Sequence, residues 1–251
     1  TNKYLFGFNG YAISIPKEKQ GAALTQISGD PQVKRIYPNF KVKAVSSESE
    51  NLINADKLRS QLGVTGLGIK IGIIDTGIDY THPDLGGCLG QSCKVKGGWD
   101  FVNGDNDPMD DQGHGTHVAA ISAADGIVGG IAPKASLYGL KALDSDGSGD
   151  YSAIIDAVEW AIDPNADKDV SDHLDVINLS LGGPGDPDDP LSQEIDKAYG
   201  AGIITVIAAG NDYSYRTIGS PGTARHALTV AAVQDEKTIA EFSSRGPVLF
   251  N

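Results

Sequence analysis

The 251-residue sequence contains no run of apolar residues long enough to span a bilayer, and no segment with the pattern of a signal peptide. It is also poor in basic residues, since 20 Lys and Arg stand against 33 Asp and Glu for a formal net charge of −13. Nucleic acids and anionic membranes bind concentrated Lys and Arg, so we expect neither as the main partner. The chain starts at Thr1 without a methionine, and we expect a processed or shortened form of a longer protein.

Cysteine is scarce as well, because only Cys88 and Cys93 occur, in the stretch GGCLGQSCK. Their spacing differs from that of CxxC zinc or redox motifs, and no second pair of ligands exists. The surrounding glycines favour a small surface loop closed by a disulfide, which predicts a secreted protein in an oxidising compartment. Two free thiols are the alternative that the sequence leaves open.

The first part of the chain predicts a small unit of its own, residues 1–43. YLFGFNGYAISIP is typical of a strand or hairpin, a short helix is expected after Pro16, and QVKRIYPNFKV is expected to form a second strand. Such a piece is too small to be stable alone. Residues 44–51, AVSSESEN, are polar and lack apolar periodicity, so they predict an exposed linker.

From residue 52 to residue 251, short apolar strands alternate with helical patterns. The predicted strands are IKIGIID, ASLYGLKAL, LDVINLSLG, IITVIAAG and ALTVAAV, and the predicted helices are HGTHVAAISAA, SGDYSAIIDAVEWAI and PLSQEIDKAYGAG. This alternation predicts an α/β fold with a mostly parallel sheet and helices on both faces. In such sheets the reactive groups gather at the carboxyl ends of the strands.

Three polar residues stand at ends of this kind. Asp75 follows an apolar strand in IGIIDTGID, His114 enters a helix in GHGTH, and Asn211 follows the strand VIAAG. A carboxylate that orients an imidazole, together with an amide donor for an oxyanion, is the equipment of nucleophilic catalysis.

These segments resemble the signature blocks of one family. IGIIDTGID, GHGTHVA, NLSLGG, AAGN and FSSRGP are similar, in this order, to blocks of the subtilisin-like serine peptidases, or subtilases. The resemblance implies that Asp75 supports His114, that His114 is the general base and later acid, and that Asn211 donates to the oxyanion. It implies a serine endopeptidase that needs no cofactor for its chemistry, acting on peptide and protein substrates.

The resemblance also implies two segments between which a peptide is held as an added strand. Their residues are Ser180, Leu181, Gly182 and Gly183 in one, and Gly147, Ser148, Gly149 and Tyr151 in the other. Tyr151 is expected to line a pocket for an apolar side chain of the substrate.

The N-terminal block is similar to the second half of the subtilase propeptide, which acts as chaperone and inhibitor. Residues 1–43 are therefore expected to be a partial, α+β propeptide. Residues 44–51 would lie near the processing point, as in a zymogen.

Metal binding is a further question. Asp84 in HPDL matches a calcium-ligand position of the family, but AADGIVGGIAP appears shortened where further ligands are usual, so calcium is left open. A zinc hydrolase using His114 and His117 is a weaker idea. The two histidines are three apart without the glutamate of the zincin motif, and His117 is expected to pack beneath the site instead.

The catalytic serine itself has no counterpart in the sequence. In the family it follows the FSSRGP block in a GTS-type motif, and none of Ser180, Ser220, Ser243 and Ser244 fits that context. Gly222 and Thr223 continue as Ala-Arg. We therefore expect this chain to be a truncated, inactive form of a peptidase; a peptide-binding or complementing fragment is the alternative function.

Overall fold

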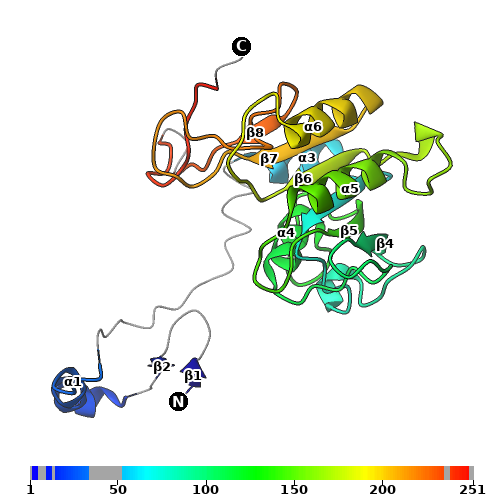
Figure 1. The fold of residues 1–251 in the computed structure, drawn as a ribbon. Coiled ribbons are helices and arrows are strands. Elements are labelled where there is room, and N and C mark those ends of the chain that lie inside the picture. The colour runs from blue at the N-terminus through cyan, green and yellow to red at the C-terminus, as the bar shows by residue number, and fades with distance from the viewer. Residues whose placement is uncertain (1, 5–9, 13–14, 34–52, 235–237, 249–251) are drawn as a thin grey trace. The chain divides into compact units, whose positions relative to one another are not determined.

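The computed structural model describes residues 2–4, 10–12, 15–33, 53–234 and 238–248 (Figure 1). The chain divides into two compact units, Thr1–Ala44 and Val45–Asn251, which are taken separately below.

The first unit contains a hairpin and a short helix. Strand β1 (Asn2–Tyr4) pairs antiparallel with β2 (Gly10–Ala12). The turn η1 (Lys17–Lys19) then leads into α1 (Gln20–Ser28), so the hairpin and the helix after Pro16 are confirmed. Most of the expected strand QVKRIYPNFKV, and the whole linker 44–51, lie outside the described residues.

The second unit is built on a six-stranded sheet in the order β4-β5-β3-β6-β7-β8, in which every neighbouring pair is parallel. The strands are β3 (Lys70–Asp75), β4 (Val95–Asp100), β5 (Ser136–Lys141), β6 (Val176–Leu179), β7 (Ile204–Ala208) and β8 (Leu228–Val230). The two strands that follow β3 in the chain, β4 and β5, lie on one side of it in the sheet, and β6, β7 and β8 lie on the other side. The carboxyl ends of β3, β5, β6 and β7 therefore share one edge, where α/β sheets bind their ligands.

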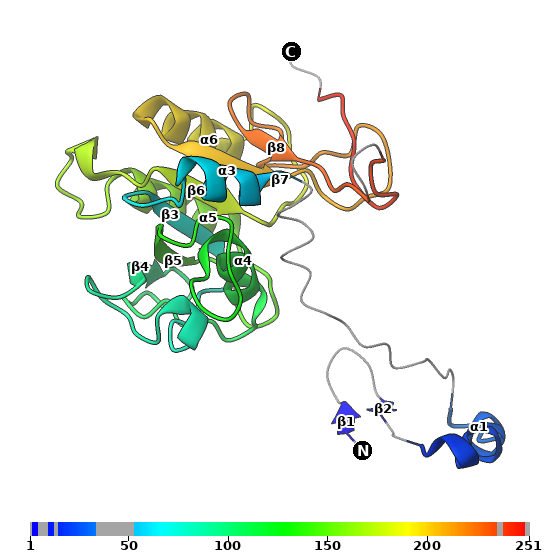
Figure 2. The ribbon, with the colours of Figure 1, turned by 180° about the vertical axis from the view of Figure 1, so that it is seen from behind.

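Helices cover both faces of this sheet. Helices α5 (Tyr151–Ile162) and α6 (Pro190–Ala201) bury their apolar residues in the cluster that contains Ile74, whereas α4 (His114–Ala123) packs in the cluster that contains Ile73. Successive side chains of a strand point to opposite faces, so the two clusters lie on opposite sides of β3. Figures 1 and 2 show α5 and α6 on one side of the sheet and α4 on the other. The predicted α/β fold is confirmed.

Two elements were not foreseen from the sequence. Strand β4, VKGGWD, carries two glycines and no clear alternation, and it forms because β5 offers a pairing edge beside it. Helix α3 (Ala55–Leu62) leaves Leu58 and Leu62 exposed and ends at Gly63. It is anchored by the guanidinium of Arg59, which donates to the carbonyls of Gly130 and Ile131 at 2.9 Å and 3.3 Å.

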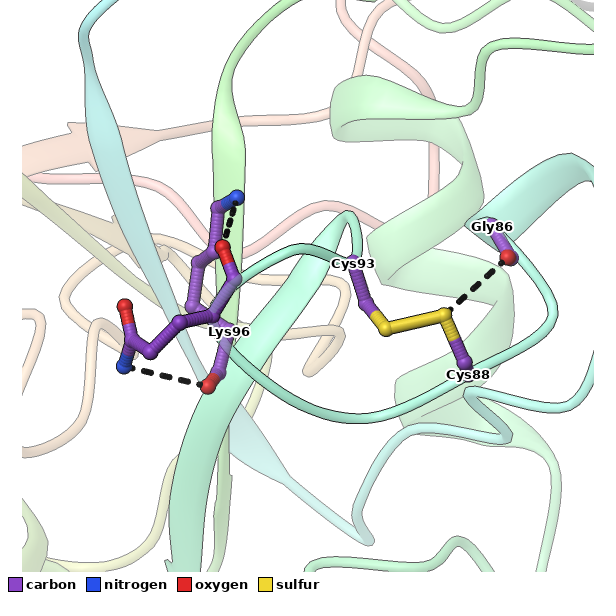
Figure 3. The surroundings of a disulfide bond; sticks show 5 residues. Gly86, Cys88, Cys93 and Lys96 are labelled. Carbon is purple, nitrogen blue, oxygen red and sulfur yellow. Dashed lines mark hydrogen bonds between the residues drawn. A yellow bond between two sulfur atoms is a disulfide. The ribbon is translucent and has the colours of Figure 1, made fainter.

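Cys88 and Cys93 form a disulfide, as predicted (Figure 3). The bridge closes the loop between the short turn η2 (Pro83–Leu85) and β4, and the Cys88 sulfur lies 3.6 Å from the carbonyl oxygen of Gly86. Lys96 fastens the same loop, because its ammonium donates to the carbonyl of Gln91 at 2.7 Å. The remaining short turn, η3 (Val170–Asp172), precedes β6.

Candidate active site

Asp75 and His114 meet at the carboxyl edge of the sheet. Asp75 ends β3 and is fully buried, while His114 is the first residue of α4. Nδ1 of the imidazole lies 2.7 Å and 2.9 Å from the two carboxylate oxygens. A carboxylate only accepts hydrogen bonds, so the proton of the neutral ring belongs on Nδ1 and Nε2 keeps its lone pair. With its side chain 45% exposed, His114 offers that lone pair to a substrate or nucleophile.

The first turn of α4 is fixed by side chains that satisfy its free N–H groups. Gln112 accepts from the backbone N–H of His114 at 2.9 Å, Thr76 from that of Gly115 at 2.9 Å, and Asp110 from that of Thr116 at 2.9 Å. Because each of these N–H groups has no partner within the helix, such bonds determine where the helix begins. The orientation of His114 is thereby tied to the residues around Asp75.

Glycine is required next to the histidine. A Cβ built on Gly115 would lie 2.1 Å from the carbonyl oxygen of Gly77 and 3.2 Å from Cβ of Asp75. Only a residue without a side chain allows α4 to approach the end of β3 this closely. The glycine after His114 in GHGTH therefore sets the distance between the base and its carboxylate.

Asp110, in the loop before α4, has a carboxyl group whose pKa is lowered. Burial raises the pKa of its carboxyl, but hydrogen bonds from the Thr116 hydroxyl and from the N–H groups of Gly113, Gln112 and Thr116 outweigh this, and the pKa lies below its ordinary value. Asp110 thus stays ionised and keeps the loop folded around the entry to α4.

His117 does not pack beneath the site as expected, because it is exposed. The buried face of α4 is formed by Gly115, Ala119 and Ala123, four residues apart, and position 117 falls between them on the outer side. Zinc binding by His114 and His117 would need further protein ligands, because zinc sites in proteins use three or four. The described residues include no group of three or more His, Cys, Asp and Glu side chains able to hold a metal.

A cavity of about 460 Å³ opens beside His114. It is bordered by both segments that are expected to hold the substrate peptide. Its lining includes Gln112, His114, Leu143, Gly147, Ser148, Gly149, Tyr151, Ser180, Leu181 and Gly182. The segment 147–149 lies in a turn in which the Asp144 N–H donates to the carbonyl of Ser148 at 2.8 Å and the Asp144 carboxylate accepts the Ser148 N–H at 3.0 Å.

Gly183 is the one residue of these segments outside the cavity lining. It pairs instead with Ser220, whose carbonyl accepts its N–H at 2.9 Å. Tyr151 crosses from α5 toward the same segment, and its hydroxyl donates to the carbonyl of Pro184 at 2.6 Å. A Cβ on Gly183 would lie 2.8 Å from that hydroxyl oxygen, so the two substrate segments are held in contact.

Asn211 follows β7 and Gly210, and it lines a second cavity of about 290 Å³. Ser180 borders both cavities, so Asn211 and His114 line neighbouring spaces at the ends of the strands. Buried Ser244 of the FSSRGP block supports this turn: its N–H donates to the carbonyl of Gly210 at 2.9 Å, and its hydroxyl accepts the N–H of Asp212 at 3.1 Å.

Among the residues that the structure describes, no serine hydroxyl is hydrogen-bonded to His114. Ser220 is fully buried and donates to Asp189 at 3.1 Å, and Ser243 is fully buried beneath the backbone of Ala232. Neither of these two serines is placed to act as the nucleophile.

Asp84 is the candidate calcium ligand that matches a position of the family, and its surroundings do not fit a calcium ion. Its two carboxylate oxygens accept the N–H groups of Ile127 and Val128, each at 3.0 Å. These bonds, that of Val128 first, lower the pKa of the Asp84 carboxyl. A Cβ on Gly126 would come within 2.0 Å of the carboxylate, so the backbone of this turn occupies the space beside it. Calcium needs six or more oxygens, and peptide N–H groups stand where some of them would be.

Three residues of the site were missed from the sequence. Lys141, at the carboxyl end of β5, is buried beside Asp75 and donates to Asp111, while Gln112 borders the cavity. Lys141 lies inside the predicted strand ASLYGLKAL, and a single charge within this mostly apolar segment is a signal that could have marked it. Asp111 and Gln112 stand in a polar loop whose composition predicts only exposure.

A parallel α/β sheet with a hydrogen-bonded Asp–His pair at its carboxyl edge, beside a cavity bordered by two glycine-rich segments, agrees with the subtilisin-like class. The chain belongs to the subtilase family, whose model matches residues 66–251. By family it is therefore a serine endopeptidase.

Individual relatives show the extent of the similarity. Subtilisin DY from Bacillus licheniformis is 46% identical over 204 residues, covering 79% of this chain and 68% of the relative. Serine protease AprX from Bacillus subtilis (strain 168) is 37% identical over 237 residues, covering 87% of this chain and 52% of the relative. A crystal structure of a cold adapted subtilisin-like serine proteinase superposes with a TM-score of 0.61 at 30% identity, over 73% of this chain and 61% of that one. The chain thus spans between about half and two thirds of these proteins.

Proposed function

We propose that the full-length protein is a serine endopeptidase in which Asp75, His114 and Asn211 act on a serine supplied outside these 251 residues. The observation that carries the proposal is the buried carboxylate of Asp75 within 2.7 Å of Nδ1 of His114, at a cavity bordered by residues 147–149 and 180–182. Subtilases need no cofactor for this chemistry, and none enters the proposal.

The proposed roles are supported by the Asp75–His114 contact and by the family's mechanism. Nε2 of His114 takes the proton of the serine hydroxyl as its oxygen attacks the peptide carbonyl, and the buried carboxylate of Asp75 stabilises the imidazolium that forms. The side-chain amide of Asn211 donates to the oxyanion of the tetrahedral intermediate. His114 then returns the proton to the leaving amine, and water releases the acyl group by the same steps.

The substrate is proposed to be a peptide or protein held as an extended strand between Gly147–Ser148–Gly149 and Ser180–Leu181–Gly182–Gly183, with Tyr151 beside an apolar side chain. Gly182 is exposed, and a Cβ there would have only one described contact, 3.5 Å from the carbonyl of Ser220. Backbone without side chains at this edge lets a peptide approach to hydrogen-bonding distance.

Residues 1–43 are proposed to be part of a propeptide that binds this same domain, with the processing point near residues 44–51. The similarity to AprX supports this, because it covers 87% of the chain, more than Val45–Asn251 alone contains. The disulfide of Cys88 and Cys93 supports secretion. No helix in the described ranges combines the length and apolar content needed to cross a membrane. Neither nucleic acid nor membrane is proposed as a partner.

An active-site-directed fluorophosphonate tests the proposed base. The full-length protein should be labelled, and its His114→Ala variant should not. His226→Ala is the matched control, since His226 is also paired with an aspartate, Asp196 at 3.0 Å, and is 49% exposed, against 45% for His114. Labelling that survives loss of His114 would exclude it as the base.

The 251-residue chain by itself is proposed to bind peptides without cleaving them, because no serine hydroxyl in the described part of the chain is bonded to His114. Purified chain should bind an inhibitor peptide and show no peptidase activity. Cleavage by this chain alone would refute the proposal of a non-catalytic fragment. Restoration of activity by an added C-terminal piece would support the complementing role.

A further inference from the structure

Lys141 is a buried charge that the mechanism above does not use. It is the last residue of β5, and only 1% of its side chain is exposed. Removing an ammonium group from water is costly unless every one of its protons finds an acceptor. A lysine at this position is therefore favoured over an apolar residue only if its charge has a role.

All three protons of the ammonium have partners. Nζ of Lys141 lies 2.9 Å from the carbonyl oxygen of Thr76, 3.0 Å from that of Leu143 and 2.7 Å from a carboxylate oxygen of Asp111. An ammonium group has three donors, so these contacts satisfy it completely.

The three acceptors belong to three different parts of the site. Thr76 directly follows Asp75, Leu143 lines the cavity four residues before Gly147, and Asp111 lies in the loop that leads into His114. Backbone hydrogen bonds also connect the end of β3 to the segment after β5. The carbonyl oxygen of Asp75 accepts the N–H of Leu143 at 3.1 Å and that of the preceding residue, Ala142.

We propose that Lys141 is a positioning residue that holds the carboxylate, the base and the cavity wall in register through these three bonds. The proposal rests on the proposed function, since the register matters for peptide hydrolysis. It explains why the residue is charged: methionine would fill the same space but leave the carbonyls of Thr76 and Leu143 without donors. Arginine is no equal substitute, because its planar fork cannot reach three acceptors arranged around one nitrogen.

The first experiment does not depend on catalysis. In the 251-residue chain labelled with ¹⁵N-histidine, the imidazole shifts report which nitrogen of each neutral ring carries the proton, and His114→Ala assigns the signal among the five histidines. We expect His114 to carry its proton on Nδ1 in the wild type and to become a mixture of the two tautomers in Lys141→Met. Lys94→Met is the matched control, because Lys94 is a half-buried lysine that donates to two carbonyls, those of Pro133 and Ala135, at 2.8 Å and 3.0 Å.

Asp111 supplies a second set of variants in which the substituted side chain is itself 49% exposed, so no buried side chain is removed. Asp111→Ala should also mix the tautomers of His114, and Asp111→Asn, which keeps an acceptor oxygen, should restore most of the wild-type signal. Asp125→Ala is the control, as Asp125 is 42% exposed and paired with Lys134 at 2.6 Å. If Lys141→Met fails to fold, the Asp111 variants decide the question.

The second experiment measures kcat and KM in the full-length protein. Misplacement of a catalytic group by about 1 Å costs about 100-fold in rate, so Lys141→Met should lose about that much of kcat/KM, mostly in kcat, while Lys94→Met stays within threefold. An inactive wild type would refute the proposed function and leave the tautomer result standing. Wild-type tautomers in both Lys141→Met and Asp111→Ala would overturn the positioning role.

Discussion

Nδ1 of His114 lies within 2.9 Å of both oxygens of Asp75, a carboxylate that has no exposed surface. One of these oxygens also accepts the backbone N–H of Thr76 at 2.7 Å. The position of the carboxylate is thus fixed at the end of β3, and its hydrogen bonds to Nδ1 fix the orientation of the imidazole. The base is preorganised before any substrate arrives.

Replacement of Asp75 by asparagine tests this arrangement in the full-length protein. The amide is almost isosteric, but its NH₂ group favours the tautomer with the proton on Nε2, which cannot accept from serine. Loss of the carboxylate in Ser–His–Asp enzymes lowers kcat on the order of ten-thousand-fold. We expect a fall of that size at neutral pH with little change in KM, measured by peptide hydrolysis.

The matched control for Asp75→Asn is Asp100→Asn. Asp100 is also a buried acid at the end of a strand, β4, and it accepts the N–H groups of Val102 and Asn103 at 2.8 Å. This variant should lose stability yet keep kcat. An equal loss of kcat in both variants would show that the effect comes from folding rather than from His114.

Asn211→Ala should lower kcat by about 100- to 1,000-fold and leave KM nearly unchanged, because an oxyanion donor acts mainly in the transition state. Asn211 is exposed and has no described side-chain bond, so the unfolding midpoint should not move. Asn165→Ala, in the exposed loop after α5, serves as the control. A rise in KM without a fall in kcat would contradict the proposed role and make Asn211 a substrate contact.

Much of this site could be predicted from the sequence because its residues follow apolar strands whose length and composition mark them clearly. Asp75 and His114 each stand beside a strong local pattern, a strand and a helix, and their contact depends on the close packing of α4 against the end of β3. Strand β4 could not be foreseen, since VKGGWD has little strand propensity and depends on its partner β5. His117 was misplaced because the burial of a helix face depends on its neighbours, and Gly115 and Ala119 make that face here.

Gly182→Ala tests the substrate edge separately from folding. The new methyl group would lie 3.5 Å from the nearest described atom, an ordinary contact, so the unfolding midpoint should stay within about 1 °C of the wild type. A bound peptide strand would meet that methyl group, and KM should rise about tenfold or more. Gly21→Ala, in α1 and without a neighbour within 4 Å, is the control. An unchanged KM would remove Gly182 from the binding edge.

Asp84 provides a prediction about cations. Since peptide N–H groups of Ile127 and Val128 hold its carboxylate, a strong chelator and millimolar calcium should leave the unfolding midpoint of the 251-residue chain unchanged.

The same bonds lower the pKa of Asp84 in the folded state, so its contribution to stability is present above the unfolded pKa of about 3.9 and is lost as the pH falls through the lower folded value. Asp84→Asn should therefore be less stable than the wild type at pH 7, and the difference should shrink below about pH 4 as the wild-type carboxylate is protonated. Asp79→Asn, an exposed loop acid that accepts the N–H of Thr81 at 3.0 Å, is the control. A calcium-dependent rise in the midpoint that Asp84→Asn abolishes would show that the turn opens to bind a cation, because N–H donors cannot serve as its ligands.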